Sequence, residues 1–179
     1  MKTRKLLFTA FILTALYGCG YTTGALMPSG ETSIYVDNFV NKIDVTREVS
    51  NEKAYYSYIP AIESDIRRRV IDRFILDGNY QIKNPDEAHF MLKGQLVEFR
   101  RDPLRYDAND NVIEYRITVV VNVELYNLKE NKLIWKEANF GGESTYRTTG
   151  QFAMSENKAV DQSINDLARR IVERTVENW

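Results

Sequence analysis

The segment 112–128 alternates apolar and polar residues over a length that constrains the fold more than any other part of the chain. One set of alternate positions is apolar or aromatic: Tyr115, Ile117, Val119, Val121, Val123 and Leu125. The intervening set is mostly polar: Glu114, Arg116, Thr118, Asn122 and Glu124. Because successive side chains of a β-strand point to opposite faces, this pattern predicts a long strand with one buried face. The chain must therefore build a sheet that is covered on one side.

Two segments with helical periodicity can provide that cover. The first spans Pro60–Asp77, and its apolar positions recur every three or four residues: Ile59, Ile62, Ile66, Val70 and Phe74. The second runs from Ser155 to about Asn178 with the same spacing: Val160, Ile164, Leu167, Ile171 and Val176. Pro60 suits a first helical turn, Gly78 a C-terminal cap and Ser155 an N-terminal cap. Both segments are predicted to be amphipathic helices.

The remaining strands are predicted at Ser33–Phe39, Tyr80–Lys83, His89–Arg101 and Lys132–Phe140. The apolar phase of the third changes near Leu96 and Val97, which predicts a β-bulge there. Residues 40–58 and 141–154 are polar and are expected to form long loops. Counting the four longer strands, the order is β-α-β-β-β-α. We expect an α+β fold, a two-layer sandwich of two helices packed on a mostly antiparallel four-stranded sheet.

Composition limits the function classes. The chain has 179 residues and a formal net charge of −1, which excludes a strongly basic nucleic-acid binder. Its length suits one domain. It has one cysteine and one histidine, so no internal disulfide can form and little is left for a metal cage or a catalytic dyad. We therefore expect no nucleic-acid partner, no metal and no cofactor.

The N-terminal segment resembles a bacterial lipoprotein signal peptide. Lys2, Arg4 and Lys5 precede the apolar run Leu6–Leu16, which is shorter than the roughly 20 residues of a bilayer-spanning helix. The run leads into Leu16-Tyr17-Gly18-Cys19, a sequence similar to a lipobox. We expect residues 1–18 to be cleaved, Cys19 to carry the acyl chains that anchor the protein, 19–32 to form a tether and 33–179 a single domain. Gly20, where an aspartate would signal inner-membrane retention, indicates the outer membrane.

No group of residues matches a catalytic or metal-binding motif. His89 is the sole imidazole, and it begins a predicted strand with no nucleophile motif nearby. The run Asp107–Asn111 has closely spaced oxygen ligands, but it lacks the later glutamate of a calcium loop and is better explained as a hairpin turn. We expect no catalytic residue. A lipid-anchored hydrolase remains an alternative, and its activity would have to be lost in the variant His89→Ala.

Basic residues gather around one predicted hairpin. They are Lys93, Arg100, Arg101, Arg105 and Arg116. Arginine binds phosphate through its planar fork, and lipopolysaccharide supplies phosphates at this cellular address. The sequence favours these residues as a lipopolysaccharide-binding site, but the neighbouring acids Asp102 and Glu114 leave open plain surface ion pairing. The run Arg67–Arg69 is better explained as a solvated helix surface.

Several short motifs resemble the LptE family of lipopolysaccharide-assembly lipoproteins. They are Cys19-Gly20-Tyr21, residues 34–41 (IYVDNFVN), 74–78 (FILDG), 87–94 (EAHFMLKG), 114–119 (EYRITV) and 133–135 (LIW). The resemblance rests on the order of these pieces and covers nearly the whole chain after Cys19.

The resemblance implies a two-helix sandwich that plugs the outer-membrane barrel protein LptD, helps its assembly and takes part in lipopolysaccharide transport to the cell surface. It implies no cofactor and no catalysis. The alternative is a lipoprotein subunit or adaptor of another outer-membrane export or envelope complex. The eleven tyrosines and the polar loops are compatible with a plug in a polar barrel lumen.

Overall fold

The computed structural model describes residues 33–43 and 59–177. The expected signal peptide, the tether with Cys19 and most of the expected loop 40–58 lie outside these residues. The elements are β1 (Ser33–Val36), β2 (Val40–Asn41), α3 (Ile62–Asp77), β3 (Gln81–Ile82), β4 (Phe90–Tyr106), β5 (Val112–Asn127), β6 (Lys132–Arg147) and α4 (Glu156–Val176).

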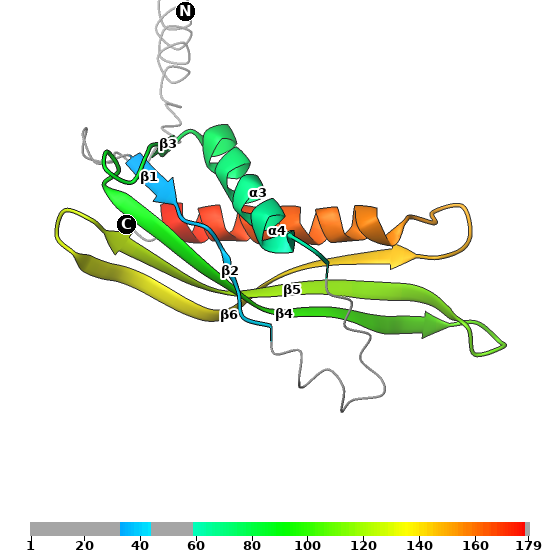
Figure 1. Ribbon diagram of the computed structural model, residues 1–179. Coiled ribbons are helices and arrows are strands. Elements are labelled where there is room, and N and C mark those ends of the chain that lie inside the picture. Colours follow the sequence, from blue (N-terminus) through cyan, green and yellow to red (C-terminus); the bar gives the residue numbers. More distant parts are fainter. Residues whose placement is uncertain (1–32, 44–58, 178–179) are drawn as a thin grey trace, which may run out of the picture. The chain divides into compact units, whose positions relative to one another are not determined.

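The strands form one mixed sheet with the order β3-β1-β4-β5-β6, and β2 pairs with β4 (Figure 1). Strands β4, β5 and β6 are antiparallel, whereas β1 runs parallel to both β3 and β4. The α+β class is confirmed, but the expectation of a four-stranded, mostly antiparallel sheet is wrong in detail, because the sheet has six strands. The crossover through α3 carries the chain from β1 back to the same end of the sheet, and such a connection produces parallel pairing.

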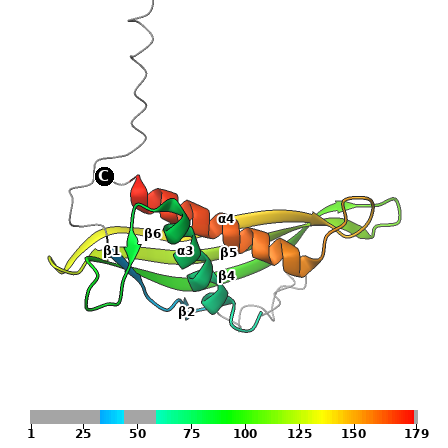
Figure 2. The same ribbon diagram turned by 90° about the horizontal axis from the view of Figure 1, so that it is seen from above.

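Both helices lie on one face of the sheet, and the other face carries no helix (Figures 1 and 2). Strand β5 places the predicted apolar set against the helices: Ile117, Val119, Val121, Val123 and Leu125 are all buried. The predicted bulge is confirmed by a register shift between Leu96 and Glu98. The meander β4–β5–β6 therefore forms the floor under α4, whereas α3 packs against α4 and the β1–β3 end of the sheet.

Strand β6 is longer than expected. Residues 141–147, predicted as a loop, pair with residues 114–120 of β5. Their polar character is explained by an alternation in which Ser144 and Tyr146 face α4, while Glu143, Thr145 and Arg147 lie on the other face. Strand β4 likewise continues to Tyr106, beyond the predicted end at Arg101. The backbone ladder extends as far as both neighbours can pair, and it does not require an apolar sequence.

The helix ends largely follow the predicted signals. Gly78 has a φ of 79° and donates its N–H to Phe74 O, which ends α3 in the left-handed conformation that glycine favours. Ser155 caps α4 and accepts the N–H of Lys158 at 3.4 Å. At the start of α3 the N-cap is Ala61 with a φ of 63°, so Pro60 lies just before the helix and not within its first turn.

The core is continuous between the layers. Tyr80 contacts Phe74 and Phe90 edge-on, with ring centroids 5.7 and 5.9 Å apart, which joins α3 to β4. On the other side, α4 packs along β6. There Asp166 accepts the N–H of Glu143 at 3.1 Å and Arg170 donates to Gly141 O, so side chains of α4 occupy part of the outer edge of this edge strand.

Candidate functional site

The five basic residues singled out in the sequence do not form one cluster. Lys93, Arg100 and Arg116 lie on the helix-free face of the sheet, where Arg100 is opposite Thr118 and Arg116 is opposite Asp102. Arg101 points to the other face, since its cross-strand neighbour is the buried Ile117. Strand alternation thus separates two adjacent arginines that the sequence pattern grouped together.

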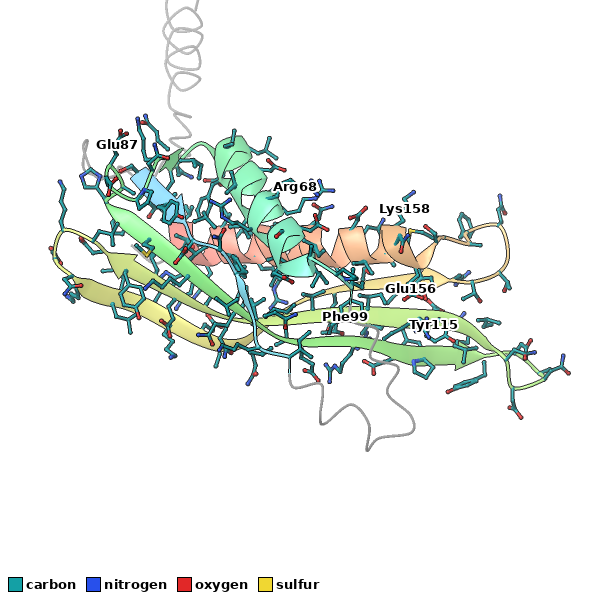
Figure 3. All side chains as sticks on the ribbon, viewed as in Figure 1. Arg68, Glu87, Phe99, Tyr115, Glu156 and Lys158 are labelled. Atoms are coloured by element: carbon teal, nitrogen blue, oxygen red, sulfur yellow. The ribbon has the colours of Figure 1, made fainter. Side chains whose placement is uncertain are left out.

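Arg101 is part of a half-buried network at the start of α4. Its Nη1 lies 2.6 Å from Glu156 Oε2, and its guanidinium stacks over the Tyr115 ring at 4.9 Å. The Tyr146 hydroxyl donates to the same Glu156 oxygen at 3.1 Å, and the rings of Tyr115 and Tyr146 are stacked. Figure 3 labels Tyr115 on the sheet and Glu156 at the start of α4. The network joins β4, β5 and β6 to the first turn of α4, which favours a structural role for Arg101.

The electrostatics of this network agree with its burial. Burial raises the pKa of Tyr146 to about 12, and the charge of Glu156 and the hydrogen bond to it act in the same direction. Burial lowers the pKa of Arg101, but the hydrogen bond to Glu156 and its charge outweigh that effect and the pKa is raised overall. Both groups therefore keep the protonation states that the hydrogen bonds need.

The arginines outside this network lie within ion-pairing distance of surface carboxylates. Arg100 Nε lies 3.6 Å from Glu98 and 3.9 Å from Asp102, Arg105 Nε 3.4 Å from Glu114, and Arg116 Nε 3.7 Å from Glu143. These pairs are long and at least partly solvated, so each contributes at most about 1 kcal/mol to stability. These contacts are the surface ion pairs that the sequence left open as an alternative. Anion binding by the same side chains stays a prediction.

The helix-free face is a polar surface with charges of both signs. Lys93 lies over the Tyr126 ring at 5.1 Å, and Glu124 receives hydrogen bonds from Lys136 and Tyr126 at 2.6 and 2.7 Å. These bonds lower the pKa of Glu124, Lys136 contributing most, and keep it ionised. The sequence pattern does not predict the residues that β6 adds to this face, because the polar composition of residues 141–147 is typical of a loop. The alternation Glu143-Ser144-Thr145-Tyr146-Arg147 is the signal that could have located them.

His89 lies in the pairing between β1 and β4. Its Nδ1 is 2.7 Å from Ser33 Oγ, and its backbone N–H donates to the same oxygen at 3.1 Å. Ser33 is only 8% exposed, so the hydrogen bonds of this pair are largely shielded from solvent. They link β1 to the start of the parallel strand β4. This arrangement agrees with the structural interpretation of the lone histidine.

The run Asp107–Asn111 forms the predicted turn. The Asp107 carboxylate accepts the backbone N–H groups of Asn109 and Asn111 at 2.8 and 2.9 Å and the Asn111 side-chain amide at 3.3 Å. Hydrogen bonds from Asn111 and Asn109 lower the Asp107 pKa. Within residues 33–43 and 59–177, no group of three or more metal-ligating side chains occurs. Nor does any helix in that part of the chain have the length and hydropathy to span a membrane.

The fold is similar to several solved structures at low sequence identity. The protein XCC0632 of Xanthomonas campestris has a TM-score of 0.56 and 11% identity, covering 87% of this chain and 90% of its own. A minor lipoprotein of Acinetobacter baumannii has a TM-score of 0.52 and 17% identity, covering 83% and 94%. At these identities the similarity establishes the fold alone. No curated protein matches the sequence.

One protein family matches most of the domain. Its description is LptE, lipopolysaccharide-assembly, and the match covers residues 32–175. This range includes the whole sheet, α3 and all of α4 except its last residue. The chain therefore belongs to the LptE family of lipopolysaccharide assembly.

Proposed function

We propose that this chain is a non-enzymatic outer-membrane lipoprotein that is anchored through Cys19, occupies the lumen of the barrel protein LptD and takes part in lipopolysaccharide transport. The observation that carries the proposal is the family match over residues 32–175, joined to the single cysteine at a lipobox position. Two or three acyl chains on Cys19 hold a protein to a membrane durably, since each buried methylene contributes about 0.8 kcal/mol.

The helix-free sheet face supports this role. A barrel lumen is polar, so a plug needs a surface of hydrogen-bonding and charged groups with few apolar residues. Lys93, Gln95, Arg116, Lys136 and Glu143 are exposed on this face. Their charges of both signs suit a polar wall better than a lipid or an apolar partner.

Co-purification from the outer membrane tests the proposal directly. The full chain, tagged at its C-terminus, is expected to incorporate labelled palmitate and to bring down a large barrel protein in equal amount. The variant Cys19→Ala is expected to lose the label and to leave the membrane fraction. Recovery of the unmodified wild-type chain in a soluble periplasmic complex without a barrel protein would contradict both anchoring and plugging.

A second prediction concerns the basic residues on the helix-free side and the hairpin. Replacing Arg100, Arg105 or Arg116 with glutamine is expected to weaken lipopolysaccharide binding about threefold each at low ionic strength, because each change removes one partly solvated charge. The loss should shrink as salt is added. Binding is measured by fluorescence titration of the purified chain with labelled lipopolysaccharide.

The matched control is Arg169→Gln on the outer side of α4, where the arginine pairs with Asp166 at 2.6 Å and Glu173 at 2.7 Å. It removes the same charge from the other layer and should leave binding unchanged. Equal losses in all four variants would indicate a general charge effect and would remove the assignment of Arg100, Arg105 and Arg116.

A further inference from the structure

A cavity of about 360 Å³ lies between α3 and the short-strand edge of the sheet. Its lining combines cationic, apolar and other polar residues: Arg67 and Lys83, then Val36, Ile71 and Ile82, and finally Tyr35, Asn84 and Glu87. None of the five basic residues predicted to bind lipopolysaccharide lines this cavity. In Figure 3 the labelled Glu87 lies in the loop between β3 and β4, and Arg68 of α3 points away from the sheet.

The cavity exists because β3 is too short to cover β1. Pairing between the two strands ends at Ile34 and Ile82, after which Lys83 N donates to Ile34 O at 3.1 Å. The next outward-facing carbonyl of β1, Val36 O, accepts Arg67 Nε at 3.0 Å. A helix side chain thus takes the position where the backbone N–H of a longer strand would bind.

This hydrogen bond fixes Arg67 and leaves most of its donors unused. Among the described residues, no carboxylate lies within ion-pairing distance of its guanidinium. Its helix neighbours differ, since Arg68 pairs with Asp65 at 2.7 Å and Arg69 approaches Asp161 at 4.0 Å. An arginine that lines a cavity and is held there through Nε keeps the donors of its two terminal amino groups for an oxyanion, which a planar guanidinium can bind bidentately.

The other charged groups leave the cavity with a net positive wall. Lys83 Nζ is 3.9 Å from Glu87 Oε2, which is the outer limit of an ion pair between two mobile side chains. Glu87 therefore offsets one of the two cations only weakly. In the same lining, the partly exposed Ile71 and Ile82 offer an apolar surface that inorganic phosphate alone would not use.

We infer that this cavity binds an oxyanion that carries an apolar substituent, a phosphate monoester or a carboxylate, with Arg67 and Lys83 on the anion and Ile71 and Ile82 on the substituent. Binding of such a ligand does not require the barrel interaction proposed above. A soluble phosphate ester and the head group of a phospholipid share this chemistry, and the binding experiment separates them.

The experiment uses the full chain, purified from membranes in non-ionic detergent, and phenyl phosphate as the probe in calorimetric titration. Phenyl phosphate is expected to bind more tightly than either inorganic phosphate or phenol. Arg67→Gln should weaken binding about tenfold or more, and Arg67→Lys should weaken it less, because lysine keeps the charge without the fork. Arg68→Gln, one residue along the helix, is the control and should bind as the wild type does.

Two variants leave the Arg67–Val36 hydrogen bond intact and keep the test valid if Arg67 variants fold poorly. Asn84→Asp adds a negative charge to the cavity wall and should weaken binding. Glu87→Gln removes the competing carboxylate and should strengthen binding about threefold. Absence of phenyl phosphate binding by the wild type, or equal affinity in both variants, would overturn the proposal.

Competition then identifies the source of the anion. If short-chain phosphatidic acid displaces phenyl phosphate at a lower concentration than a soluble sugar phosphate does, the site takes a lipid head group. If the sugar phosphate is the better competitor, it takes a free phosphate ester. Displacement by neither, in a chain that binds phenyl phosphate, would restrict the site to the aromatic group and contradict the proposed ligand class.

Discussion

The variant Gly142→Ala is expected to lose about 3 kcal/mol of unfolding free energy, a large loss for the addition of a single methyl group. Gly142 lies in β6 under the middle of α4. A Cβ atom there would be 2.5 Å from Leu167 Cβ, from Leu167 N and from Ser163 O. Two of these three atoms belong to the helix backbone, so no rotamer change can relieve the overlap and α4 must move away from the sheet. The melting temperature should fall by roughly 10 °C.

The adjacent residue provides the control. Gly141 faces the helix-free side, and a Cβ there would meet Val119 O at 3.8 Å and Val120 Cγ2 at 4.0 Å, which are ordinary contacts. Because neither glycine has a positive φ, backbone strain does not separate them. Gly141→Ala should therefore be neutral or slightly stabilising in urea unfolding. Similar losses in the two variants would show that α4 does not approach β6 as closely as the structure indicates.

The parts of the fold that were predictable are those with a periodic signal and a local stop. The alternation of residues 112–128 predicted which face of β5 is buried, and the spacing of Ile66, Val70 and Phe74 predicted the inner face of α3. Gly78 predicted a helix end because glycine, which has no Cβ, readily adopts the left-handed conformation, and Ser155 predicted one because its hydroxyl accepts a backbone N–H of the first turn. In each case the interaction that decides the structure lies within a few residues of the signal.

The parts that were not predictable depend on partners far away in the sequence. The length of β6 beyond Phe140 is set by its ladder with residues 114–120, and the parallel pairing of β1 is set by the crossover through α3. The candidate site shows the same limit. Arg100 and Arg101 are the same residue type at adjacent positions. Because successive side chains of a strand point to opposite faces, Arg100 lies on the helix-free face and Arg101 pairs with Glu156 on α4. Likewise, Arg67 differs from Arg68 and Arg69 only because it lies next to the unpaired edge of β1, where it donates a hydrogen bond to Val36 O.

The second large effect is expected from reversing the charge of Arg101. The side chains of Arg101 and Glu156 are only 21% and 33% exposed, and Arg101→Glu would place two carboxylates at this interface beside the Tyr146 hydroxyl. A fully buried ion pair that loses one partner costs about 3–5 kcal/mol, so partial exposure reduces the expected loss to about 2–3 kcal/mol. The loss should show in urea unfolding and become smaller in high salt.

Exchanging both charges tests whether the loss of stability comes from the broken ion pair or from placing a glutamate at position 101 in itself. The double variant Arg101→Glu with Glu156→Arg should recover more than half of the lost stability. Recovery stays incomplete because Glu156 is in the first turn of α4, where a negative charge is favoured by about 0.3–1 kcal/mol and a positive charge is not. Arg100→Glu, the neighbouring residue on the helix-free face, should change stability by less than about 1 kcal/mol. If Arg100→Glu destabilised the chain as much as Arg101→Glu, the assignment of the two arginines to opposite faces would be wrong, because only the face toward α4 contains the network that makes the reversal costly.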